Sequence, residues 1–454
     1  MYKQNIYDEV ERLSEVGLNA CRFIWNNPEV GGTESVSSDF YRDLLAKEGF
    51  KIVNDEKLPY AFYAEYGEGK PVIALLGEYD ALPALSQEAS AERKAVEEGK
   101  PGHGCGHNLL GSGAYLAALA IKTFIEKGEL KGTIRYYGCP EEELLSGKVK
   151  MIYHGMFEGC DFAMSWHPMP SNEVYDEAFL ASASMKFHFK GKTSHAGFAP
   201  EQGRSALDAV ELMNVGCNYL REHIVDKCRI HYTTDSYGYP PNIVPDKASS
   251  WYCIRAPRID IVKDIMRRLE LVARGAAMMT ETEVDIEVIS GCCELNPNHA
   301  FSDLTYQNMV QVNLPQYTEE EMAFAKALQA TLNPAILAKD EKTFNSYGTG
   351  MHLDLCSREK YKETPLNASS DSGDVSMIMP MNYFTTACFP LGVAAHTWQA
   401  TASAGSSIGE KGMLYAAKIT AGVIYDLLTD EEARDRITKE FNENKPEYSP
   451  MYQE

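Results

Sequence analysis

The sequence predicts an α/β protein, in which a mixed-sheet domain is interrupted by a smaller domain of the ferredoxin-like α+β class. Three observations support this prediction. The 454 residues suffice for two or three domains. Strand-like apolar segments alternate with helical ones up to about Leu180 and again after about Ser290. Between these points the order changes to β-α-β-β-α-β, which is the ferredoxin-like order.

Helices are expected at three places in the N-terminal part. Apolar residues at helical spacing predict one helix over Ile6–Trp25. Ser37 and Ser38 are good N-caps and predict a second helix that ends at Lys47. A third helix, rich in Ala and Leu, is expected over Leu109–Phe124.

Strands of the same part are expected where short apolar runs occur. These runs are Lys51–Val53, Tyr60–Tyr66, Val72–Leu76, Gly132–Tyr137 and Phe162–Trp166. The unbroken run Val72–Leu76 fits a strand that is buried on both faces. Polar candidate residues follow these strands directly, and ligands bind at that edge of an open α/β sheet.

The inserted domain and the remainder complete the expected order, with domains over 1–179, 180–291 and 292–454. In the insertion we expect strand Ala181–Lys190, helix Ser205–Val225, strands Arg229–Thr234 and Ala248–Arg255, helix Asp260–Met279 and strand Glu283–Ile289. After it come helix Glu319–Ala330, a strand near Tyr383–Phe389 and helix Gly409–Leu428. The last twenty residues are polar and are expected to be peripheral.

Composition excludes several classes of function. A formal net charge of −22 disfavours nucleic acid and anionic membranes as partners. Eleven irregularly spaced cysteines predict reduced thiols in a reducing compartment. The N-terminus shows no apolar secretory signal, and no uncharged apolar run reaches transmembrane length. We therefore expect a cytoplasmic protein.

The turn Gly102–Asn108 carries the most informative motif. Cys105 and His107 are two residues apart, and a thiolate with an imidazole is a compact pair of ligands for a transition metal. A lone Cys-x-His is a weak signal, since a buried thiol beside a loop histidine is the commoner case. The flanking glycines favour the metal, because they let the backbone turn both side chains toward one point.

An acidic run follows a second predicted strand. Pro140 is followed by Glu141, Glu142 and Glu143, and such a run is most often a solvated surface. Here it directly follows an apolar strand, where the edge of the sheet is expected. One carboxylate at that place reaches a metal while its neighbour acts as general base on water.

Two further histidines and an aspartate complete the set. His167 and His396 each follow an apolar strand, although singly each would more often be a structural histidine. Asp80 is either a turn former or the carboxylate that orients a ligand histidine. The five candidate ligands are Cys105, His107, Glu143, His167 and His396. Five ligands fit two metal ions better than one, which usually takes three ligands in a catalytic zinc site.

The inserted domain offers His195, Asn242 and Arg255 as candidate substrate-binding residues. Their side chains are of the types that bind an oxyanion or a substrate carboxylate. Their spacing does not show that they converge, and surface loops of a structural domain are the alternative.

Taken together, these motifs resemble the M20 metallopeptidase superfamily, and within it the amidohydrolase branch that uses a Cys-Gly-His pair. The resemblance runs from about Asp8 to Ile424. It is carried by Gly102–Gly111, Tyr137–Met151, Gly203–Val210, Asp371–Ser376 and His396–Gln399. Within the branch these motifs resemble most closely the hydrolases of p-aminobenzoyl-glutamate.

The resemblance implies a phosphorylase/hydrolase-like catalytic domain with two divalent metal ions, Zn or Mn, and an inserted lid and dimerisation domain. It implies the five ligands named above, Glu142 as general base and Asp80 as supporting residue. It further implies that His195 stabilises the oxyanion in the partner subunit's active site, and that Asn242 and Arg255 bind the substrate's carboxylate. A homodimer is expected, or a heterodimer with a related subunit.

One departure from the family pattern affects the acidic run. The family reads Pro-x-Glu-Glu-Gly-x-x-Gly, whereas this chain has a third acid at Glu141, and Leu144 in place of a glycine. Counting from either side makes Glu142 the base and Glu143 the ligand, but a shift by one residue stays open. Leu144 is expected to alter the wall of the pocket.

The sequence thus favours a metal-dependent amidohydrolase of N-acyl amino acids, with p-aminobenzoyl-glutamate as the substrate that the resemblance implies. Small dipeptides, including β-alanyl ones, are the alternative substrates. The chain as a non-catalytic partner subunit is an alternative of another class. A cysteine hydrolase that uses Cys105 is the weakest alternative.

Overall fold

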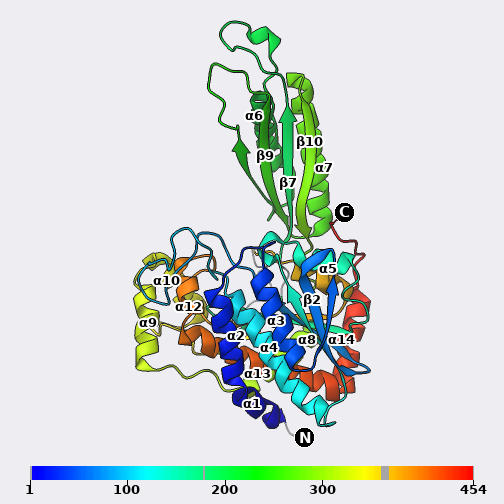
Figure 1. Ribbon diagram of the computed structural model, residues 1–454, viewed down its shortest axis with the longest axis vertical. Helices are drawn as coiled ribbons and strands as arrows, with labels where there is room; N and C mark the ends of the chain where they lie inside the picture. Colours follow the sequence, from blue (N-terminus) through cyan, green and yellow to red (C-terminus); the bar gives the residue numbers. More distant parts are fainter. Residues whose placement is uncertain (1–2, 177–178, 359–367, 453–454) are drawn as a thin grey trace. The chain divides into compact units, whose positions relative to one another are not determined.

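The computed structural model describes residues 3–176, 179–358 and 368–452 (Figure 1). The described chain divides into two compact units. The first comprises residues 3–176, 296–358 and 375–449. The second comprises residues 179–295, with the short segments 368–374 and 450–452. The second unit is therefore an insertion in the sequence of the first.

A seven-stranded mixed sheet forms the centre of the first unit, and it confirms the predicted fold class. Its strands are β1 (Lys51–Asp55), β2 (Leu58–Glu68), β3 (Val72–Glu78), β4 (Gly132–Cys139), β5 (Phe162–Met169), β6 (Glu173–Val174) and β11 (Met381–Ala387). Their order is β1-β2-β4-β3-β5-β11-β6. The four strands β4, β3, β5 and β11 run parallel, whereas β1, β2 and β6 pair antiparallel with their neighbours. The carboxyl ends of the four parallel strands therefore share one edge.

Helices of the first unit pack around this sheet. They are α1 (Lys3–Arg12), α2 (Ser14–Asn26), α3 (Ser35–Lys47), α4 (His107–Glu126), α5 (Gly147–Tyr153), α8 (His299–Gln311), α9 (Glu319–Gln329), α10 (Pro334–Phe344), α12 (Trp398–Ala404), α13 (Ser407–Thr429) and α14 (Glu431–Asn444). Helix α11 (Ser372–Ile378) begins in the second unit and ends in the first. Helix α4 packs against β3, β4 and β5 on one side and against α13 on another. Within the described chain, α4 alone is long and apolar enough to cross a membrane, and 83% of that apolar stretch is buried inside the fold.

Three predicted helix boundaries were wrong, each for a local reason. The predicted helix over 6–25 is two helices, because the chain breaks at Leu13. Helix α3 starts at Ser35 instead of Ser37, since the Glu29 carboxylate accepts the N–H groups of Val36 and Ser37 and so caps the helix from outside. Helix α6 ends at Leu220, before a short 3₁₀ turn.

The expectation of a peripheral C-terminal segment was wrong for the residues up to Asn444. Residues 431–444 form α14, which packs against α8 and α13. Its buried side chains Ala433, Ile437 and Phe441 recur every fourth residue along one face. The many charged residues on the other faces hid this narrow apolar stripe from a reading of composition.

The second unit is a four-stranded antiparallel sheet with two helices packed on it. Its elements are β7 (Ala181–Lys190), α6 (Ala206–Leu220), β8 (Arg229–Asp235), β9 (Lys247–Ala256), α7 (Ile259–Thr280) and β10 (Glu283–Cys292). The strand order is β10-β7-β9-β8, and every neighbouring pair is antiparallel. Helices α6 and α7 pack against each other and against the sheet, where they bury a core of their own (Figure 1).

Close packing of α4 on β3 gives a test of the fold. A Cβ atom at Gly111 of α4 would lie 2.6 Å from the carbonyl oxygen of Glu78, so Gly111→Ala has to push the helix away from the strand. We expect it to lower the free energy of unfolding by about 1–3 kcal/mol, measured by urea denaturation. Gly275→Ala, inside α7, is the matched control. No atom lies within 4 Å there, and we expect equal or greater stability. Equal stabilities of the two variants would contradict the packing described.

Candidate metal centre

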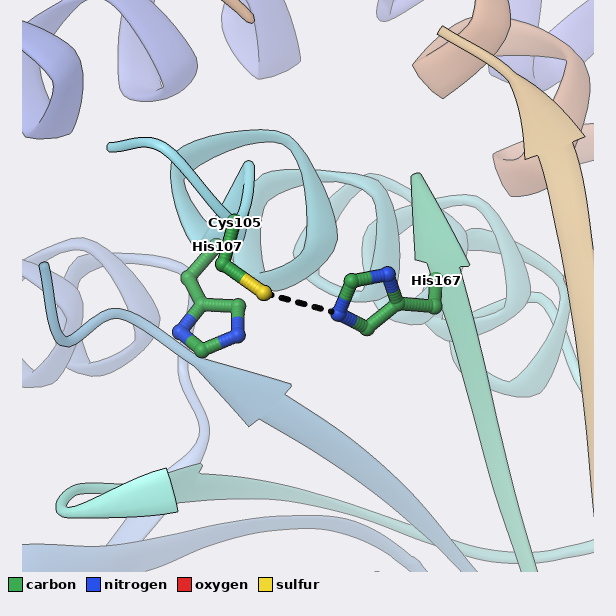
Figure 2. Close-up of side chains that lie close together, drawn as sticks. All are labelled: Cys105, His107 and His167. Carbon is green, nitrogen blue, oxygen red and sulfur yellow. Dashed lines mark hydrogen bonds between the residues drawn. The ribbon is translucent and has the colours of Figure 1, made fainter. Parts of the chain in front are cut away.

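The Cys105–His107 turn lies at the start of α4 and directs two donor side chains to one place. Gly106 has a φ of +79°, and a Cβ atom there would lie 2.7 Å from Pro168, so only glycine fits. The Cys105 thiol lies 3.4 Å from Nε2 of His167, and the His107 and His167 rings are perpendicular with centroids 5.7 Å apart (Figure 2). The predicted role of the glycines in this turn therefore has a direct geometric basis.

All five predicted ligands and the predicted base lie in three overlapping clusters of donor atoms. Within each cluster the donor atoms are at most 4.8 Å from one another. The clusters are Cys105, His107 and His167; Cys105, Glu143 and His396; and Glu78, His107 and Glu142. Since Cys105 and His107 each belong to two clusters, the whole set forms one continuous centre.

The three successive glutamates of the acidic run point to different places. Glu141 adopts a left-handed backbone with φ of 57°, and its carboxylate accepts hydrogen bonds from Ser146 at 2.6 Å and from Lys150. Glu142 lies 3.8 Å from Nε2 of His107. Glu143 lies 3.3 Å from Nε2 of His396. The geometry therefore places Glu142 and Glu143 at the centre and turns Glu141 away from it.

Asp80 connects the turn to the acidic run. Its Oδ1 accepts a hydrogen bond from Nδ1 of His107, and its Oδ2 accepts one from the backbone N–H of Glu143, both at 2.8 Å. The side chain is fully buried. One carboxylate thus orients the imidazole of His107 and also holds the backbone that carries Glu143.

The two remaining histidines are held by backbone contacts. Nδ1 of His167 donates to the carbonyl oxygen of Pro168 at 2.9 Å, which leaves Nε2 directed at Cys105. His396 has a left-handed φ of 66°, and its N–H donates to the carbonyl oxygen of Gly104 at 2.8 Å. This bond ties the His396 loop to the turn that carries Cys105. Strained backbone of this kind clusters at functional sites.

Sequence reasoning missed Glu78, Lys148 and Glu34. Glu78 ends β3, and its carboxylate lies 3.4 Å from Nε2 of His107 and 2.7 Å from Nζ of Lys148. Glu34 accepts the backbone N–H of Glu141 at 2.8 Å, and burial, with the nearby Asp80, raises its pKa to about 8. The position of Glu78 at a strand end was a usable signal. Lys148 and Glu34 carried none, because their partners are distant in sequence.

In the second unit, the His195 and Asn242 loops lie side by side. The N–H of Ala196 donates to the carbonyl oxygen of Asn242 at 2.9 Å, and both His195 and Asn242 are exposed. Arg255 lies near the far end of β9, roughly 27 Å away at the usual rise of a strand. Within one chain, the structure therefore does not bring Asn242 and Arg255 together. Leu144 of the first unit is half exposed and packs over Gly31.

Comparison with known proteins places this geometry in a family. Residues 74–352 match the peptidase family M20/M25/M40. The chain is 40% identical to one of the subunits of p-aminobenzoyl-glutamate hydrolase from Escherichia coli, over 94% of its own length and 93% of that protein. It belongs to peptidase family M20/M25/M40. The family and the predicted resemblance are thus confirmed, and this M20 protein is a metal-dependent hydrolase of amide or peptide bonds.

Other relatives agree with this assignment. The chain is 27% identical to the Xaa-Arg dipeptidase of Mus musculus, over 96% of the chain and 90% of that protein. The crystal structure of an aminobenzoyl-glutamate utilization protein from Klebsiella pneumoniae has the same fold, with a TM-score of 0.62 at 17% identity, covering 91% of this chain and 97% of that one. A dinuclear metal-binding M20 peptidase from Bacillus subtilis shares it too, with a TM-score of 0.59 at 17% identity and coverage of 92% and 99%.

The donor atoms of this M20 protein fit a pair of divalent cations. Thiolate, imidazole and carboxylate are the ligands that such cations take in proteins. Nε2 of His107 and Oε1 of Glu143 are buried and have no hydrogen-bond partner among the described residues. Buried polar atoms in that state are expected to be satisfied by an ion or a water molecule. Cys105, His107, His167, Glu143 and His396 are the residues that would hold the ions.

Electrostatics prepares these donors for a cation. Burial, helped by nearby His107, lowers the pKa of His167 to about 4, so its imidazole is neutral and has a free lone pair at pH 7. Burial alone would lower the pKa of His107, but the Cys105 and Asp80 side chains outweigh it and raise the pKa well above its usual value. Burial, together with Glu143, raises the pKa of the Cys105 thiol. Cation binding must therefore displace protons from Cys105 and His107.

Removing one acceptor of Asp80 tests its double role. In Asp80→Asn only one oxygen remains, so either His107 or the Glu143 N–H loses its partner. We expect metal affinity to fall roughly 10- to 100-fold, measured by competition with a chromophoric chelator. Asp161→Asn is the matched control, because Asp161 also accepts two bonds, from Val72 and Lys70, at 2.7 Å each but is outside the centre. Similar affinities for the two variants would refute the role given to Asp80.

The raised pKa values predict how metal affinity depends on pH. At low pH, protons on Cys105 and His107 compete with the cation, so affinity is lost as pH falls. We expect apparent affinity to rise about tenfold per pH unit, from pH 6 to 8, for each proton displaced. Calorimetric titration in buffers of different ionisation enthalpy counts the protons released. Binding that is independent of pH would show that neither group loses a proton.

Proposed function

We propose that this chain cleaves the amide bond of an N-acyl amino acid with two divalent cations, Zn²⁺ or Mn²⁺, and that p-aminobenzoyl-glutamate is the favoured substrate. The convergence of five donor residues and Glu142 in one buried centre carries the proposal. The choice of substrate is supported by 40% identity, over nearly the whole chain, to a hydrolase of that name.

The residues of the first unit have distinct roles in this proposal. Divalent cations at the centre supply Lewis acidity, which lowers the pKa of water and polarises a carbonyl group. Glu142 takes the proton of the attacking water and later gives it to the leaving amine. Its carboxylate is more than nine-tenths buried and shares a donor cluster with Glu78 and His107. Asp80 keeps His107 in the orientation that leaves Nε2 available.

For the second unit we propose substrate recognition. His195 is assigned to the oxyanion of the tetrahedral intermediate, and Asn242 and Arg255 to the carboxylate of the substrate. Because Asn242 and Arg255 are distant within one chain, we propose that the active assembly is a dimer in which two chains contribute different members of this set. A second copy is the expected partner, or a related subunit.

Two other functions have specific support. A dipeptidase is favoured by 27% identity to the Xaa-Arg dipeptidase, over 96% of the chain. A partner-subunit role is favoured by a further match, 27% identical over 59% of the chain, to another of the subunits of the Escherichia coli hydrolase. The presence of every predicted ligand and of Glu142 argues for catalysis by the chain itself.

A substrate panel separates these functions. The purified chain, reconstituted with Mn²⁺ or Zn²⁺, is assayed against p-aminobenzoyl-glutamate, β-alanyl dipeptides and dipeptides with a C-terminal arginine. The highest kcat/KM is expected for p-aminobenzoyl-glutamate. Preference for a dipeptide would replace the substrate assignment. Inactivity on the whole panel, reversed by adding a related subunit, would favour the partner role.

Adjacent glutamates provide an internal control for the catalytic base. Glu142→Gln removes the group that accepts the proton, so we expect kcat to fall roughly 10²- to 10⁴-fold with little change in metal content. Glu141→Gln keeps an acceptor for Ser146 outside the centre, and we expect kcat within a few-fold of the wild type. If Glu141→Gln proved the more damaging of the two, the acidic run would be shifted by one residue.

A further inference from the structure

A buried ion pair outside the predicted ligand set borders the metal centre. Nζ of Lys148 lies 2.7 Å from Oε1 of Glu78, and both side chains are at most 1% exposed. Burying two charges is costly, and an apolar pair of similar volume often gives equal or better stability. The pair therefore calls for an explanation other than stability.

The free end of Glu78 faces the centre. Its Oε2 has no hydrogen-bond partner among the described residues and lies 3.4 Å from Nε2 of His107. Glu78 also shares a donor cluster with His107 and Glu142. A buried carboxylate in this position is a ready additional ligand for a cation held by His107, and it would compete there with the substrate.

Lys148 is placed to prevent this. It belongs to α5, which begins five residues after Glu142, whereas Glu78 ends β3. The pair thus links the acidic run to the strand that carries Asp80. Lys148 also contributes to lowering the pKa of Asp80, whose largest lowering influence is His107 and which burial alone would raise.

Charge leads to the same conclusion. Glu78, Asp80, Glu142, Glu143 and the Cys105 thiolate carry five formal negative charges when ionised. Lys148 reduces this excess to four, which equals the charge of two divalent cations. Without Lys148 the donors would bind cations more tightly than turnover requires.

We infer that Lys148 is a positioning residue that holds Glu78 beside the metal centre and keeps it from becoming an additional ligand. This inference rests on the proposed function, because it presumes that cations bind at the centre. Lys148 acts through Glu78, and neither residue is assigned to the bond-breaking chemistry.

Opposite effects of the two single substitutions on metal affinity form the test. Lys148→Met releases Glu78 and removes a positive charge, so we expect affinity for Mn²⁺ to rise roughly tenfold while kcat falls. Glu78→Gln leaves the lysine charge without its partner, so we expect affinity to fall roughly tenfold. The double variant Glu78→Gln/Lys148→Met should return to within a few-fold of wild-type affinity. Affinities come from chelator competition, and the unfolding midpoint of the metal-free protein is recorded for each variant.

Lys150→Met is the matched control, because Lys150 lies on the same helix and pairs with Glu141 outside the centre. It should leave metal affinity unchanged. A purely structural pair predicts that both single variants lose affinity together with stability, and that outcome would overturn the inference. If Lys148→Met does not fold, weaker binding by Glu78→Gln with recovery in the double variant supports the inference, and no recovery overturns it. Absence of metal binding by the wild type would instead refute the proposed function.

Discussion

The metal centre depends above all on the two hydrogen bonds that Asp80 accepts. One fixes the imidazole of His107, and the other fixes the backbone of Glu143. These two residues come from different segments, the turn before α4 and the loop after β4. A buried carboxylate with both oxygens occupied holds both segments in one register, which a longer or a neutral side chain would not do.

Parallel strands supply the framework on which this clamp operates. Strands β3, β4 and β5 end at the same edge of the sheet, where Asp80, the acidic run and His167 follow them. Helix α4 starts at that edge with His107 and is almost wholly buried against the sheet. Close contact at Gly111 keeps the helix near β3, so the position of His107 is set by core packing as well as by Asp80.

Electrostatics explains why so many acids can be buried together. The Asp80–His107 pair, the Glu78–Lys148 pair and the bonds of Glu141 to Ser146 and Lys150 each offset part of the negative charge. Glu142 and Glu143 are left facing the thiol and the imidazoles. That surplus of negative charge is what gives the centre its affinity for divalent cations.

The sequence by itself determined the fold class, the family, the five donor types and their positions at strand ends, because periodicity and short motifs are local properties. It did not determine which two of three adjacent glutamates face the centre, since that depends on the left-handed backbone of Glu141 and on partners five to nine residues away. It also gave no sign of the Glu78–Lys148 pair or of helix α14. Only the tertiary structure decided these, because each requires contacts between segments that are brought together by folding.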